Sequence, residues 1–171
     1  MIPKKNEALK ELEELVFQRK LTDYPRVPQN AVPRMKFRDT NSNGLTQAIL
    51  ACFRVHDIFA TRIDSKGTFN QALKRFIPSN QKKGLPDIFA QTPGLPPIWV
   101  EVKCETTGDR LKPHQVDMIA ELRRSGAIVY VAGNFEDFYE WFKCKILKTV
   151  GASSDQHAED SITPAPAQVK E

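Results

Sequence analysis

The sequence GLPDIFAQTPGLPPIWVEVK, residues Gly84 to Lys103, decides the fold. Two short apolar segments lie on either side of a Pro- and Gly-rich loop, and this pattern predicts two strands joined by a turn. Side chains alternate along the second strand, expected over Ile98–Cys104, so Glu101 and Lys103 point to the same face as Trp99. The opposite face is apolar and carries Ile98, Val100 and Val102. An acid and a base therefore share one face of a strand apolar enough to be central in a sheet.

A second carboxylate, Asp87, begins the preceding strand directly after a Gly-Leu-Pro turn. If the two strands pair through the loop, Asp87 lies close to Glu101. Two carboxylates suit a hard divalent cation such as Mg²⁺ or Mn²⁺, and the backbone carbonyl of Val102, between the two functional side chains, is a further possible ligand. Lys103 beside two carboxylates stays charged, so we expect it to act electrostatically rather than as a general base.

Each of these residues also has a simpler interpretation. Pro-Asp after Gly is common turn chemistry, and Glu-x-Lys on a strand is often a solvated charge pair. The combination with a Gly-containing lead-in, a hairpin loop and a following helix favours a functional site.

The composition limits the class of protein. A chain of 171 residues with 40% hydrophobic and 27% charged residues fits one globular domain. It has no apolar run of about 20 residues, its start is charged, and its three cysteines form no Cys-x-x-Cys pair, which predicts a cytoplasmic protein with free thiols and no zinc site. The net charge is +4, and residues 151–171 hold four acidic residues and one lysine, so the rest is more basic. A basic domain indicates a polyanionic partner such as DNA, although many intracellular domains are mildly basic.

The order of elements follows from hydrophobic periodicity and from Pro and Gly. Before the strand pair we expect a helix over 4–20, a Pro-rich basic connector over 22–43, a helix over 44–57 capped by Ser42 or Asn43, a strand over 58–63 and a short helix over 70–76. After the strand pair we expect a helix over 113–125, a strand over 127–132 and a helix over 134–148. The residues of the helix over 113–125 expected to face the core are Val116, Ile119, Ala120 and Leu122. The strand–helix–strand passage implies a right-handed crossover between parallel strands.

The predicted fold class is therefore α/β, with a mixed four-stranded sheet flanked by helices. Three regions follow from the composition: residues 1–43 form an N-terminal helix and connector, 44–148 form the domain that carries the site, and 149–171 form a disordered tail.

The motifs resemble those of a nuclease family. Pro86-Asp87 followed by Glu101-Val-Lys103 is similar to the PD-(D/E)XK nuclease superfamily. The VRR-NUC family is closer, on Gly84-Leu-Pro-Asp87, Glu101-Val-Lys103, Gly108-Asp-Arg-Leu111, Gln115 and the passage from Leu122 to Val131. The resemblance covers about Gly44 to Trp141.

The resemblance implies a restriction-endonuclease-like αβββαβ core and Mg²⁺- or Mn²⁺-dependent cleavage of DNA phosphodiester bonds. It implies that Asp87, Glu101 and Lys103 act at the metal and the phosphate, and it adds Gln115 as a catalytic residue. Standalone members of the family resemble Holliday-junction resolvases, so the expected substrate is branched or junction DNA and the expected assembly is a homodimer.

The family often has a glutamate in the first core helix that completes the metal site, where this chain offers Gln47. An amide oxygen can ligate a metal but carries no charge, so metal affinity is expected to be weaker; Asp57 or Asp64 are alternatives. A nuclease-fold domain that binds DNA without efficient cleavage is therefore the alternative function. An unrelated α/β interaction domain is the remaining possibility. It requires the whole set of motifs to be accidental, and failure of Asp87 and Glu101 to converge would support it.

The basic residues that flank the site in sequence are candidates to hold DNA phosphates. They are Lys66, Lys74, Arg75, Lys82, Lys83, Arg110 and Lys112. The sequence shows no base-reading motif, which favours structure-selective over sequence-specific cleavage. We interpret His56 and His114 as structural or solvent-facing, and Trp99 as packed under a helix.

Overall fold

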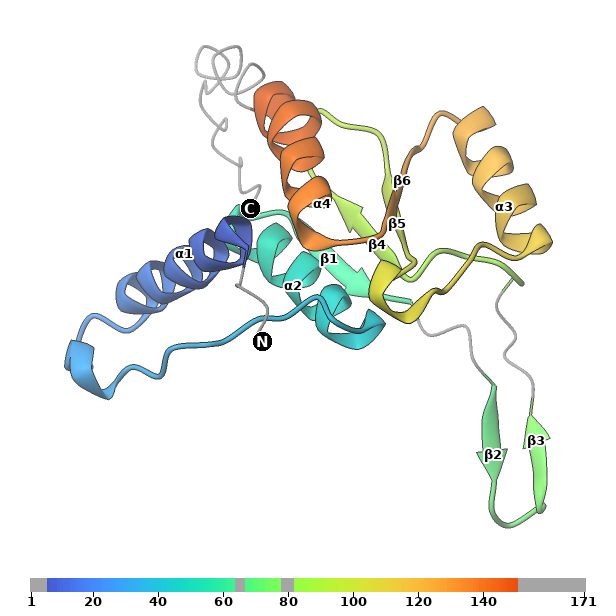
Figure 1. Ribbon diagram of the computed structural model, residues 1–171, viewed down its shortest axis with the longest axis horizontal. Coiled ribbons are helices and arrows are strands. Elements are labelled where there is room, and N and C mark those ends of the chain that lie inside the picture. The colour runs from blue at the N-terminus through green and yellow to red at the C-terminus, as the bar shows by residue number, and fades with distance from the viewer. Residues whose placement is uncertain (1–5, 64–66, 78–81, 151–171) are drawn as a thin grey trace, which may run out of the picture.

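The computed structural model describes residues 6–63, 67–77 and 82–150 (Figure 1). Its helices are α1 (Glu7–Asp23), α2 (Ser42–Val55), α3 (Pro113–Arg124) and α4 (Phe135–Phe142), and α4 continues as a π-helical turn over Lys143–Leu147. Its strands are β1 (Phe59–Arg62), β2 (Thr68–Asn70), β3 (Arg75–Ile77), β4 (Ile88–Gln91), β5 (Ile98–Val102) and β6 (Ile128–Ala132). Short 3-10 turns cover Gln29–Ala31 and Glu105–Thr107. Lys66, Asp64 and the expected tail beyond residue 150 lie outside the described residues.

Four strands form one sheet in the order β1-β4-β5-β6. β4 pairs antiparallel with both β1 and β5, and β5 pairs parallel with β6 through the crossover helix α3. In the β4–β5 register Ile88 lies opposite Val100. This arrangement confirms the predicted mixed sheet flanked by helices, and it is consistent with a restriction-endonuclease-like core.

The two faces of β5 meet different surroundings. Ile98, Val100 and Val102 are buried in the hydrophobic core that α1, α2 and α4 build on one face of the sheet. Phe53 of α2 packs edge-on against Phe142 of α4, with ring centroids 5.4 Å apart. Helix α3 lies on the other side of the sheet (Figure 1). The polar face of β5 therefore lies on the same side of the sheet as α3.

Asp39, in the connector between α1 and α2, ties this segment to the ends of three other elements. Its Oδ2 accepts hydrogen bonds from the Phe135 backbone N–H (3.1 Å) and from the Asn6 side chain (3.4 Å). Its backbone carbonyl accepts from the Cys104 thiol at 3.1 Å. One residue of the connector thus holds the starts of α1 and α4 near the end of β5.

The short helix expected over 70–76 is wrong, because this segment forms the antiparallel hairpin β2–β3, in which Asn70 pairs with Arg75. Lys74 takes the left-handed backbone conformation (φ 46°) in the turn, and that conformation is incompatible with continued helix. The cap of α2 is Asn41 rather than Ser42 or Asn43, since the Asn41 side chain accepts from the Gly44 N–H at 2.8 Å.

Helix α3 buries a narrower stripe than expected. Met118 and Ile119 are buried, whereas Val116 is 50% exposed and Ala120 is also exposed. The helix contacts the sheet mainly along β6, so only residues close to that line lose their solvent contact. In the described part of the chain, no helix combines the length and apolar character needed to cross a bilayer.

Candidate active site

A pocket of about 450 Å³ opens where the polar face of β5 meets the start of α3. The structure brings together Asp87, Glu101, Lys103 and Gln115 there, with Val102 in the same wall. The remaining lining residues come from α2, the end of β1, the loops beside β4 and α3, and the first turn of α3: Ser42, Thr46, Arg62, Ile63, Lys83, Gly84, Leu85, Asp109, Lys112 and His114.

Asp87 is held from both neighbouring strands. Its backbone carbonyl accepts from the Ile63 N–H at 2.8 Å, and its side-chain Oδ2 accepts from the Val102 N–H at 2.9 Å. Continuing the β4–β5 register by one residue places Asp87 opposite Glu101. The two carboxylates therefore converge because the strands pair antiparallel through a short loop.

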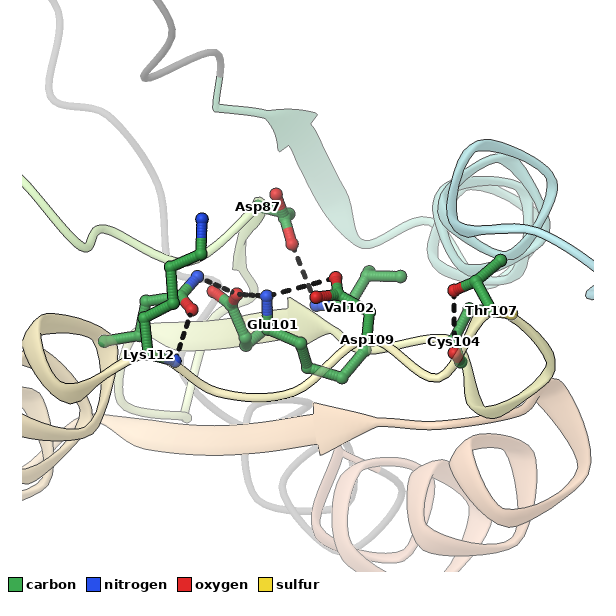
Figure 2. A network of polar contacts seen from close by, with 9 residues as sticks. Asp87, Glu101, Val102, Cys104, Thr107, Asp109 and Lys112 are labelled. Carbon is green, nitrogen blue, oxygen red and sulfur yellow. Dashed lines mark hydrogen bonds and ion pairs between the residues drawn. The ribbon is translucent and has the colours of Figure 1, made fainter.

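Glu101 is the most deeply buried charged residue of the pocket, with 1% of its surface exposed. Its Oε1 accepts a hydrogen bond from Gln115 Nε2 and lies 3.1 Å from Lys103 Nζ (Figure 2). Its Oε2 is buried and has no hydrogen-bond partner among the described residues. Burial first, and then the charge of Asp87, raise the pKa of Glu101 to about 7 despite the opposing effect of Lys103.

Lys103 lies between two acidic side chains. Its backbone N–H donates to Ala132 of β6 at 2.8 Å, and its Nζ lies 3.1 Å from Glu101 Oε1 and 3.3 Å from Asp109 Oδ2. Burial lowers the pKa of Lys103, but hydrogen bonds and charge from Glu101 and Asp109 outweigh it, so the net shift is upward. Lys103 is therefore a fixed ammonium group rather than a proton acceptor at neutral pH.

Gln115 connects the start of α3 to the carboxylate. Its Oε1 accepts from the Lys112 N–H at 3.0 Å, which caps the helix, and its Nε2 donates to Glu101. Pro113 occupies the first turn, where its lack of an N–H has no cost. One amide side chain thus both begins the helix and orients Glu101.

The donor set is small but suits a hard cation. Among residues 6–63, 67–77 and 82–150, no group of three or more His, Cys, Asp or Glu side chains is arranged to hold a metal ion. Asp87, Glu101 and the Val102 carbonyl nevertheless fit Mg²⁺, which keeps several waters and requires few protein ligands. A cation would also give the unpartnered Glu101 Oε2 a ligand and favour the ionised form of this carboxyl.

Comparison with protein-family models agrees with this geometry. The VRR-NUC domain matches residues 28–135, which is more than half of the chain. The chain belongs to the VRR-NUC domain family. It thus contains a nuclease-fold domain of a DNA-processing family. Neither the curated proteins nor the solved structures compared with the chain give a match.

The pocket that holds Asp87 and Glu101 does not include Gln47, which the sequence had suggested as a further metal ligand. Gln47 is exposed and lines a separate hollow with Lys36, Phe37, Arg38 and Gly44. Successive helical residues are rotated by about 100°, so Thr46 faces the pocket and its neighbour does not. Asp57 is also absent from the pocket, since its carboxylate pairs with Arg19 at 2.7 Å.

The sequence analysis gave no functional role to the pocket residues Asp109, Thr46 and Arg62. Asp109 follows Gly108, and its ion pair with Lys103 depends on how the loop folds back. Thr46 and Arg62 gave no motif signal; Arg62 Nη1 donates to Asn43 Oδ1 at 2.9 Å from the end of β1. His114, interpreted as structural or solvent-facing, does line the pocket, and its backbone carbonyl contacts the main chain at Gly84.

The predicted phosphate-binding residues are spread over several places. Lys83 and Lys112 line the VRR-NUC pocket, and Arg110 is exposed in the loop before α3. Lys82 pairs with Glu121 of α3 at 2.5 Å. The other two described residues of this set, Lys74 and Arg75, are exposed on the hairpin β2–β3.

Proposed function

We propose that this VRR-NUC protein is a metal-dependent DNA endonuclease that hydrolyses phosphodiester bonds. The observation that carries the proposal is the convergence of Asp87 and the buried, partly unpartnered Glu101 beside the ammonium of Lys103. Asp87, Glu101 and the Val102 carbonyl would hold Mg²⁺ or Mn²⁺. Such an ion, when bound, neutralises charge on the phosphate and makes water a better nucleophile.

The side chains of the chain have separate roles around this group. Lys103 presents a permanent positive charge at the pocket, which stabilises the negative charge that develops on the attacked phosphate. Gln115 fixes the orientation of Glu101 through its hydrogen bond, and Asp109 fixes the position of the Lys103 ammonium. Lys83 and Lys112 at the pocket wall and Arg110 in the adjacent loop would bind the DNA backbone on either side.

We infer structure-selective cleavage of branched or junction DNA. The basic residues around the pocket suit phosphate contacts, which carry no sequence information. Two symmetric scissile strands need two sites, so a homodimer is the expected active assembly. Cys52 and Cys104 are buried and form no disulfide, which agrees with the proposed cytoplasmic location.

A cleavage assay on a substrate panel tests the function. The panel contains linear duplex, single strand, flap, splayed arm and four-way junction, each with Mg²⁺, Mn²⁺ or a chelator. Cleavage that requires metal and is lost in Lys103→Ala supports the nuclease, and preference for the junction supports the substrate. Cleavage confined to one recognition sequence would contradict structure selectivity.

A DNA-binding module that does not cut is the second candidate. It is favoured by the small donor set: Gln47 does not reach the pocket, and the described residues hold no cluster of three metal-ligating side chains. Calorimetric titration with Mg²⁺ and Mn²⁺ separates the two. Absence of binding in the millimolar range together with retained DNA affinity would identify the binding module.

Gln115→Ala is expected to reduce the cleavage rate by about tenfold to a hundredfold, because loss of a side chain that orients a metal ligand typically has that effect. The alanine also leaves Glu101 Oε1 with Lys103 as its remaining partner among the described contacts. Steady-state rates at saturating Mg²⁺ measure the effect. Gln47→Ala makes the same chemical change outside the pocket and is expected to leave the rate unchanged; equal losses in both variants would contradict the role of Gln115.

A further inference from the structure

The hairpin β2–β3 is inserted in the chain between the paired strands β1 and β4, forms a separate two-stranded sheet and stands away from the rest of the molecule (Figure 1). Three residue pairs, from Thr68–Ile77 to Asn70–Arg75, hold it together. Residues 71–75, which form its tip, are all exposed. A two-stranded ribbon is at best marginally stable on its own, so a binding partner is a physical reason to retain it.

All the charged residues of this segment are basic. Residues 65–86 contain five lysine or arginine residues and no acidic residue. Lys74 and Arg75 lie at the exposed tip, and Leu73 beside them is 56% exposed. Cations next to an apolar side chain match the phosphates and base edges of a nucleic-acid groove.

The described residues that flank the hairpin segment in the chain belong to the pocket wall. Ile63 precedes the segment and Lys83 and Gly84 follow it; all three line the pocket, and the Ile63 N–H donates to the Asp87 carbonyl. The return segment is fixed on α3: Lys82 pairs with Glu121, and the Gly84 backbone (φ 89°) approaches the His114 carbonyl so closely that a Cβ there would lie 2.4 Å from its oxygen. The segments before and after the hairpin are therefore anchored at the pocket and on α3.

We propose that β2–β3 is a duplex-binding arm that enters a groove of DNA on one side of the scissile phosphate. The major groove, about 12 Å wide, admits a two-stranded ribbon, and Lys74 and Arg75 contact the phosphates that border it. The inference rests on the proposed function and specifies its substrate: the protein requires a double-stranded arm beside the cleavage position. Single strands and duplexes too short to reach the tip bind more weakly.

Binding in the presence of a chelator tests the arm independently of cleavage. The probes are labelled duplexes that extend about 5 or about 15 base pairs to one side of the expected cleavage position. Their binding is compared for the wild-type protein and for Lys74→Ala/Arg75→Ala. Loss of two phosphate contacts is expected to reduce the slope of log affinity against log salt by about 1.8 and to weaken binding of the longer duplex about tenfold or more at low salt. The shorter duplex should bind both proteins alike.

Lys145→Ala/Lys148→Ala removes the same charge from the exposed surface that follows α4, outside the pocket, and should keep the wild-type salt slope. The proposal that β2–β3 binds duplex DNA is contradicted by any of three results: equal losses of binding in the two double variants, unchanged binding by the hairpin variant, or no binding by the wild type. A change in oligomeric state measured by light scattering would instead identify the hairpin as a subunit contact and also overturn it. Loss of cleavage from every substrate with intact arm-dependent binding would contradict only the nuclease.

Discussion

Asp87→Asn is expected to lower the rate of metal-dependent cleavage by about a thousandfold or more. The asparagine oxygen can still accept the hydrogen bond from the Val102 N–H, so the contact between β4 and β5 is kept. One of the two negative charges that would hold the cation is lost, however, and the metal supplies several kcal/mol of transition-state stabilisation. Single-turnover cleavage of the best substrate in Mg²⁺ measures the effect.

Asp117→Asn provides the matched control, because Asp117 is exposed on α3 and does not line the pocket. It should cleave at the wild-type rate, and both variants should unfold at wild-type urea concentrations or higher. A folded Asp87→Asn protein that retains more than about a tenth of the activity would exclude Asp87 as a principal metal ligand. Calorimetric titration of the same variant with Mn²⁺ then shows whether metal affinity or a later step changed.

Glu101→Gln is expected to stabilise the metal-free protein at pH 8 by about 3 kcal/mol while abolishing efficient cleavage. The pKa of Glu101 is about 7 in the folded protein and about 4.5 in the unfolded chain, a gap worth about 1.4 kcal/mol per unit. Below pH 4.5 the carboxyl is protonated in both states and has no effect. Between pH 4.5 and 7 the unfolded chain releases this proton more readily, so the free energy of unfolding falls as pH rises and is lower by the full amount above pH 7.

Urea unfolding from pH 4 to pH 8 with a chelator present measures this difference. The stabilisation by Glu101→Gln should be near zero at pH 4 and grow through pH 7, whereas Glu140→Gln, on the exposed face of α4, should follow the wild type at every pH. Added Mg²⁺ should reduce the advantage of the glutamine variant, because a cation stabilises the folded protein with ionised Glu101. A pH-independent difference would show that Glu101 is not held at a raised pKa.

The site carboxylates were predictable because they depend on local rules. Period-two alternation places Glu101 and Lys103 on one face, and a short Pro- and Gly-rich loop allows only antiparallel pairing of β4 with β5, which sets Asp87 opposite Glu101. The bounds of α3 could also be predicted from local sequence, because Pro113 begins the helix and Gly126, with φ 86°, follows its end.

Other features required the tertiary structure. Whether Thr46 or Gln47 faces the pocket depends on the rotation of α2, which its packing against α1 and α4 sets. In the segment that forms β2–β3, Phe69, Leu73 and Phe76 recur at three- and four-residue intervals, which is the spacing typical of a helix. The strand pairing therefore overrides the local pattern.

The sequence by itself determined the family, the sheet order around β4 and β5, and the identity of the two carboxylates and the lysine, because neighbours along the chain dictate those positions. Only the tertiary structure decided that Asp109 pairs with Lys103, that Glu101 is buried with a pKa near 7, and that the basic segment between β1 and β4 forms a hairpin. These properties depend on burial and on charges brought together from distant segments, and no local pattern encodes them.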